Sequence, residues 1–133
     1  MFGTSGFSWN AEMDETTVLF RPVGQKELEL IRQSPFTEFP TRLPEQPIFY
    51  PVLSEEYATQ IERDWNAKRN DSKVGYVTRF YVRTEYLKQY EIQTVGGSVH
   101  KEYWIPAEDL AQFNQNIVGR IELLAEYRND EED

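Results

Sequence analysis

The sequence predicts an α+β domain built around one mixed or antiparallel sheet of about six strands, with three or four helices. Segments in which apolar and polar residues alternate are interspersed with segments whose apolar residues recur every three or four positions. Proline and glycine mark many of the boundaries between them. With 133 residues, we expect one domain over residues 16–128, between a flexible segment at 1–15 and an acidic tail at 129–133.

A proline and a glycine mark the first strand and the first helix. Residues 17–21 are rich in β-branched and aromatic side chains, and we expect Pro22 to end this strand. Gly24 precedes a predicted helix over 25–33, in which apolar residues lie three apart. The segment 35–47 contains four prolines, which predicts a stiff irregular loop of the kind that often carries function.

A short strand and an amphipathic helix are expected after this loop. The strand covers residues 48–50 and ends at Pro51. Ser54 is expected to cap a helix over 55–68, because a serine side chain can accept a hydrogen bond from the first turn. The spacing predicts that one buried stripe of this helix consists of Tyr57, Ile61 and Trp65.

The second half is expected to supply the central strand. Residues 74–82 show the most regular alternation in the chain, which favours a central position. Thr84 is expected to cap a short turn of helix, and a weaker strand is predicted over 92–95. The remaining elements are a strand at 100–106, a helix bearing Leu110, Phe113 and Ile117 that Gly119 closes, and a strand at 120–127 with Ile121, Leu123, Ala125 and Tyr127 on one face.

Composition narrows the class of protein. The chain has no cysteine, no apolar run near the length of a membrane span, and no basic-then-apolar leader, so we expect a cytoplasmic protein with no membrane partner. Its net charge of −9 disfavours a general binder of nucleic acid, although it leaves room for a local basic cleft. Nothing in the sequence indicates an oligomeric state.

Several common catalytic motifs are absent. One histidine and no cysteine leave no ordinary zinc ligand set, so no metal site is expected. Gly96-Gly97 lacks the third glycine of a dinucleotide fingerprint, and no phosphate-binding-loop lysine pattern occurs. No nucleophile elbow surrounds any serine, which argues against a serine-histidine-acid triad through His100.

The strand around Glu102 holds the strongest candidate site. Because side chains alternate along a strand, His100, Glu102 and Trp104 are expected on one face. His100 is the only histidine, and two glycines precede it where a backbone can approach a ligand closely. The alternative interpretation is an edge strand whose Glu102 face is solvated.

The order of these elements resembles the ADP-ribosyltransferase fold, with its arginine-serine-glutamate subclass nearest, over about residues 17–127. The chain is also similar to small uncharacterised bacterial proteins in the stretches Leu19-Phe20-Arg21-Pro22-Val23-Gly24, Leu43-Pro44-Glu45-Gln46-Pro47-Ile48-Phe49-Tyr50-Pro51-Val52-Leu53 and His100-Lys101-Glu102-Tyr103-Trp104-Ile105-Pro106. The family's Ser-Thr-Ser strand motif is absent, and the corresponding stretch offers only Ser54.

This resemblance implies an enzyme that cleaves the nicotinamide-ribose bond of NAD and transfers ADP-ribose to an unknown acceptor, which could be a protein. It implies catalytic roles for Glu102 and, two residues earlier, His100, and it implies that Arg21 binds the diphosphate. Tyr50, Ser54 and Trp104 complete the expected NAD site, with a ring stacked on the nicotinamide.

Other interpretations stay open. Arg21 is also typical of a solvated or surface-paired arginine, and Tyr50 and Trp104 are also typical of core rings. Arg79 could line a cleft or face water. A non-catalytic interaction module, such as an immunity or regulatory protein, would use the acidic surface and the proline-braced loop for recognition. A nuclease or RNA-processing domain fits the layout but not the single histidine and acidic charge.

Overall fold

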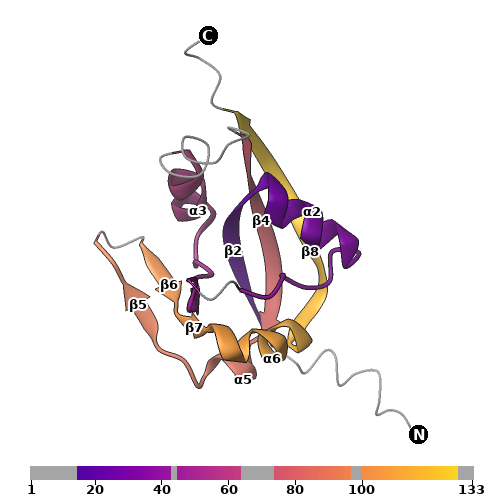
Figure 1. Cartoon of the computed structure of the whole chain (residues 1–133). Helices are drawn as coiled ribbons and strands as arrows, with labels where there is room; N and C mark the ends of the chain where they lie inside the picture. The colour runs from indigo at the N-terminus through magenta and orange to yellow at the C-terminus, as the bar shows by residue number, and fades with distance from the viewer. Residues whose placement is uncertain (1–14, 43–44, 64–73, 97–99, 129–133) are drawn as a thin grey trace, which may run out of the picture.

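The computed structural model describes residues 15–42, 45–63, 74–96 and 100–128. It confirms an α+β architecture (Figure 1). The strands are β2 (Thr16–Gly24), β3 (Ile48–Phe49), β4 (Val74–Arg83), β5 (Ile92–Thr94), β6 (Lys101–Tyr103), β7 (Ile105–Pro106) and β8 (Ile117–Arg128). The helices are α2 (Gln25–Gln33), α3 (Glu55–Ile61), α5 (Thr84–Leu87) and α6 (Leu110–Gln115), with a 3₁₀ turn η2 (Ala107–Asp109) before α6.

The described strands form three small antiparallel sheets, so the prediction of one six-stranded sheet is wrong. The largest has the order β2-β4-β8, while β3 pairs with β7 and β5 with β6. β4 is central to its sheet, as its alternation predicts. Isolated bridges at Val52 join β2 to β6, so the β2-β4-β8 and β5-β6 sheets meet at this residue.

Pro22 does not end the first strand, contrary to the prediction. β2 continues to Gly24, with Pro22 opposite Val77 of β4. The amide of Phe20 points away from β4, toward the carbonyl of Val52. Backbone nitrogens two residues apart in a strand face the same edge, so the nitrogen of Pro22 also faces away from β4 and its missing N–H removes no bond of that ladder.

The two predicted helix caps have different outcomes. Ser54 is the N-cap of α3, and its hydroxyl oxygen accepts a hydrogen bond from the amide of Tyr57 at 3.0 Å. Thr84 is instead the first residue of α5, after the N-cap Arg83. Its hydroxyl lies 2.6 Å from that of Thr17 on β2, so it ties the helix to the sheet rather than capping it.

The helix predicted over 55–68 is described from Glu55 to Ile61. Trp65, the third member of the predicted stripe, lies outside the described residues. Tyr57 and Ile61 are half-buried and pack against a cluster of Phe20, Val52, Ala58 and Val77. This half of the stripe therefore faces the sheet.

Gly119 does not close the last helix, and Ile117 does not belong to it. α6 ends at Gln115, where Asn116 is the C-cap and its side-chain amide donates to the carbonyl of Gln112. Gly119 lies inside β8 with a φ of +80°, at a register shift opposite Arg79 and Tyr81 of β4. A second shift lies between the pairs Thr78–Leu123 and Val77–Ala125. Leu123 is exposed although the predicted face includes it.

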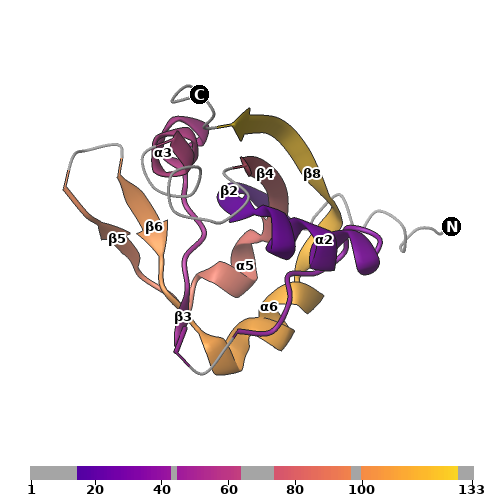
Figure 2. The ribbon, with the colours of Figure 1, turned by 45° about the horizontal axis from the view of Figure 1, so that its top comes forward.

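Two clusters of apolar side chains pack on opposite faces of β4. The ribbon shows α2 on one side of β2 and α3 on the other (Figures 1 and 2). The larger cluster places Phe80 and Val82 against residues of α2 and α6. The smaller joins Val77 to Ala58 of α3. Alternate residues of β4 serve the two faces, which explains why this strand is buried along most of its length.

The proline-rich loop after α2 is fastened to the core. Phe39 is buried, its amide donates to the side-chain oxygen of Asn114 at 2.9 Å, and its carbonyl accepts from the same side-chain amide at 3.0 Å. The Phe39 ring also packs 5.0 Å from Phe49 and 4.8 Å from Phe80 between ring centroids. These contacts hold the loop against α6 and β3 at Phe39, and so fix the position of the chain that leads into residues 40–42.

Candidate active site

Backbone bonds at Val52 join the segment of β2 that carries Arg21 to the strand that carries Glu102. The amide of Phe20 donates to the carbonyl of Val52, and the amide of Val52 donates to the carbonyl of Phe20, both at 2.8 Å. On its other side, Val52 bridges Glu102. Phe20, Val52 and Glu102 therefore lie opposite one another on three neighbouring backbone segments, and Arg21 is the next residue along β2.

A cavity of about 770 Å³ lies at this junction. This volume is within the usual range for sites that bind small molecules. Four residues expected from the sequence to form the site line it: Arg21, Tyr50, Glu102 and Trp104. The polar side chains of Glu27, Arg42 and Gln46 also line the cavity.

Arg21 is buried at 9% exposure, so the interpretation as a solvated surface arginine is wrong. Its Nε donates to Oε2 of Glu27 at 2.8 Å and its Nη2 to Oε1 at 3.1 Å, which is a bidentate ion pair. The guanidinium carbon lies 4.6 Å from the centroid of the Phe49 ring. Glu27 lies in the first turn of α2, and α2 directly follows β2, the strand that carries Arg21.

Glu102 is buried at 8% exposure, and both of its carboxylate oxygens accept hydrogen bonds. Oε1 accepts from the hydroxyl of Tyr57 at 2.9 Å, and Oε2 from the indole Nε1 of Trp104 at 2.6 Å. Both donors are neutral, so they orient the carboxylate without cancelling its charge. Glu102 and Trp104 lie on one face of their strand, as the alternation predicts.

Tyr57 is the residue that connects Glu102 to His100. Burial, followed by its hydrogen bond to the Glu102 carboxylate, raises the pKa of Tyr57 to about 12. The phenol is therefore a proton donor throughout the neutral pH range. The imidazole of His100 stacks on the Tyr57 ring, with centroids 4.6 Å apart and planes inclined at 22°.

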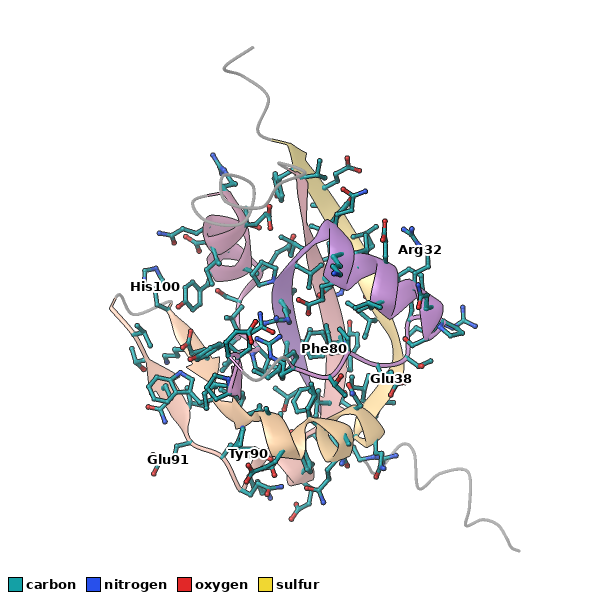
Figure 3. The ribbon with its side chains drawn as sticks, viewed as in Figure 1. Arg32, Glu38, Phe80, Tyr90, Glu91 and His100 are labelled. Carbon is teal, nitrogen blue, oxygen red and sulfur yellow. The ribbon has the colours of Figure 1, made fainter. Side chains whose placement is uncertain are left out.

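His100 and Ser54 are not brought to the cavity wall. Figure 3 shows His100 near the β5–β6 hairpin and α3, well away from Phe80 in the core. Its Nδ1 lies 3.1 Å from the carbonyl oxygen of Val95 and its Nε2 lies 3.2 Å from Oε1 of Gln60. The hydroxyl of Ser54 is engaged by the α3 cap.

The two aromatic rings at the cavity are exposed rather than part of the core. Tyr50 is 42% exposed and Trp104 is 45% exposed. Their centroids lie 6.4 Å apart with an interplanar angle of 84°, so the rings meet edge to face. Such rings can offer a face to a planar ligand group. Arg79, by contrast, forms an exposed ion pair with Glu122 and does not line this cavity.

Four polar contributors to the site were not expected from the sequence: Glu27, Arg42, Gln46 and Tyr57. Glu27 and Tyr57 occupy positions that the periodicity assigns to ordinary helix residues, and their partners lie in other elements. Arg42 belongs to the proline-rich loop, whose stiffness and length were the one signal available. Its contacts depend on how the loop folds back against Phe49.

Comparison with protein-family models and with curated proteins finds no match to this chain. Within the described residues, no helix is long and apolar enough to cross a membrane. No group of three or more histidine, aspartate or glutamate side chains in the same residues is arranged to hold a metal ion. The site must therefore be interpreted from its own chemistry.

Proposed function

We propose that this protein binds NAD in the cavity between Arg21 and Glu102, cleaves its nicotinamide-ribose bond and transfers ADP-ribose to an acceptor. The observation that carries the proposal is that a buried arginine and a buried carboxylate, far apart in the sequence, line one cavity with two exposed aromatic rings. A solvated strand face would not require this convergence.

Arg21 and Glu102 would have different tasks. A guanidinium binds phosphate oxygens, so the arginine side of the cavity would hold the diphosphate. The Glu102 carboxylate would accept a hydrogen bond from a ribose hydroxyl and stabilise the positive charge that develops at the anomeric carbon. The bonding electron pair leaves with nicotinamide. The acceptor, or water in a hydrolytic reaction, then bonds to that carbon and releases its proton to the solvent.

The neighbours of Glu102 suit this task. Tyr57 and Trp104 hold both carboxylate oxygens, so the charge would be positioned before the substrate arrives. The exposed rings of Tyr50 and Trp104 provide surfaces on which a nicotinamide ring would stack. His100 would act only through Tyr57, which makes it a positioning residue in this proposal.

Release of nicotinamide from NAD by the purified protein tests the proposal, with and without cell extract as a source of acceptor. Glu102→Gln should lower the rate by roughly 100-fold or more, because the amide keeps the size but loses the charge. Glu108→Gln, which changes an exposed glutamate of η2, is the matched control and should retain the rate. Circular dichroism of each variant separates loss of chemistry from loss of fold.

If the wild-type protein neither releases nicotinamide nor gains stability from NAD, the enzymatic proposal is wrong. The non-catalytic interaction module would then be the better account, since it needs no occupied cavity.

A further inference from the structure

The charge of Arg21 is already compensated inside the protein. Two of its guanidinium nitrogens donate to the two carboxylate oxygens of Glu27. A phosphate would therefore have to displace Glu27 or use the remaining Nη1, which makes no hydrogen bond with any described residue. Arg21 alone is an incomplete anion site.

Arg42 lines the same cavity and lacks such a partner. Its Nε is buried and has no hydrogen-bond partner among the described residues. Within the part of the chain that the structure describes, its Nη2 donates only to the carbonyl of Ile48, at a long 3.4 Å. Burial, and then the charge of Arg21, lower the pKa of Arg42. A buried cationic donor without an acceptor is costly, so a bound anion would stabilise this arrangement.

The two guanidinium groups are held next to a common ring. The Arg21 carbon lies 4.6 Å and the Arg42 carbon 5.8 Å from the centroid of Phe49. Phe49 is fully buried, and the loop that carries Arg42 is anchored at Phe39 by the side chain of Asn114. Packing of the core therefore holds the two guanidinium groups near each other, and their positive charges repel across the cavity.

We propose that Arg42 is the principal anion-binding residue of this cavity, and that it binds a phosphate group which also reaches Nη1 of Arg21. This inference rests on the proposed function, because it takes the ligand to be a diphosphate ester that carries a planar base. Glu27 then acts as an internal competitor: its carboxylate occupies the Arg21 donors that an anion would otherwise engage.

Calorimetric titration with inorganic pyrophosphate tests the anion site without the rest of the ligand. ADP-ribose is the second probe, and the phosphate-free nucleoside nicotinamide riboside is the third. Arg42→Gln should weaken binding of pyrophosphate and ADP-ribose by roughly 10- to 100-fold, as expected for loss of a charge-assisted hydrogen bond. Nicotinamide riboside should bind equally to both proteins.

Two further variants sharpen the test. Arg79→Gln removes the same charge from an exposed ion pair outside the cavity and should change the affinity less than twofold. Glu27→Gln should tighten pyrophosphate binding, because it releases two donors of Arg21. A purely structural role for Arg42 would not predict this opposite sign. If Arg42→Gln does not fold, Arg42→Lys, which keeps the charge, replaces it in the binding test.

The outcomes separate this inference from the proposed function. Pyrophosphate binding that requires Arg42, without nicotinamide release from NAD, would support the anion site and overturn the proposed reaction. Nicotinamide release with equal affinities in wild type, Arg42→Gln and Arg42→Lys would support the reaction and overturn the anion site. Failure of pyrophosphate to bind the wild-type protein would also overturn it.

Discussion

The indole Nε1 of Trp104 donates to Oε2 of Glu102 at 2.6 Å, so one exposed ring both lines the cavity and orients its carboxylate. The two residues are separated by a single position, and the strand that carries Glu102 ends between them. This short connection couples the aromatic wall of the site to its acidic group.

The strength of this coupling can be measured with a double-mutant cycle of Trp104→Phe and Glu102→Gln. Phenylalanine keeps a ring but removes the indole donor, and glutamine removes the charge. We expect a coupling free energy of about 1–2 kcal/mol in urea unfolding, in the range for a hydrogen bond from a partly exposed donor to a charged group. Additive effects of the two substitutions would show that the indole donor does not interact with the charge of the Glu102 carboxylate.

Tyr57 should make the stability depend on pH in the alkaline range. Its pKa in the folded protein is about 12, above the ordinary value of 10.0, so the folded state retains this proton longer than the unfolded state. The stability that Tyr57 contributes is therefore complete below about pH 10 and is lost as the pH rises through about 12.

Urea unfolding of wild type and Tyr57→Phe across this pH range measures the effect. The stability difference between them should shrink between pH 10 and 12, while Tyr81→Phe, a tyrosine of β4 outside the site, controls for a general loss of phenol groups. A difference that stays constant with pH would mean that Tyr57 does not hold its proton against Glu102.

Arg21→Lys should weaken the fold as well as NAD binding. A lysine cannot reproduce the two parallel bonds to Glu27 or the planar contact with Phe49, so we expect a loss of about 1–3 kcal/mol in the free energy of unfolding. Arg79→Lys, in an exposed pair, should cost less than about 0.5 kcal/mol. Equal losses in both variants would argue that burial of the Arg21 pair has no energetic consequence.

Gly75 should not tolerate a side chain while Glu62 is present. A Cβ at Gly75 would lie 1.4 Å from Oε2 of Glu62, whose side chain is fully buried. Gly75→Ala should therefore destabilise the protein by about 1–3 kcal/mol, as overpacking does. In a Glu62→Ala background the same change should cost less than about 1 kcal/mol. An unchanged urea midpoint for Gly75→Ala alone would disprove the close approach.

Local pattern predicted several elements correctly. The helix over 25–33 matches α2, because Leu28 and Ile31 are spaced for one buried face. β4 was placed centrally from its alternation, and Glu102 and Trp104 were placed on one face. For α2 and for the pair Glu102 and Trp104, the residues that share a face are close in sequence, and a periodic pattern records them.

The errors and omissions arise from contacts between distant segments. Whether Pro22 ends a strand depends on which edge its nitrogen faces, and that is decided by Val52. The helix that Gly119 was expected to close stops earlier because Ile117 pairs with Val82 as the first residue of β8. Tyr57 reaches Glu102 across 45 positions of sequence, and no local pattern records such a pair.

The melting temperature with and without NAD tests the central claim most directly. Because a ligand that binds only the folded state must stabilise it, NAD at about one hundred times its Kd should raise the melting temperature of the wild-type protein by roughly 5–10 °C. Glu102→Gln should keep most of this rise, and Arg21→Lys should lose part of it. A melting temperature that does not respond to NAD, or a rise that Arg21→Lys leaves unchanged, would contradict NAD binding between Arg21 and Glu102.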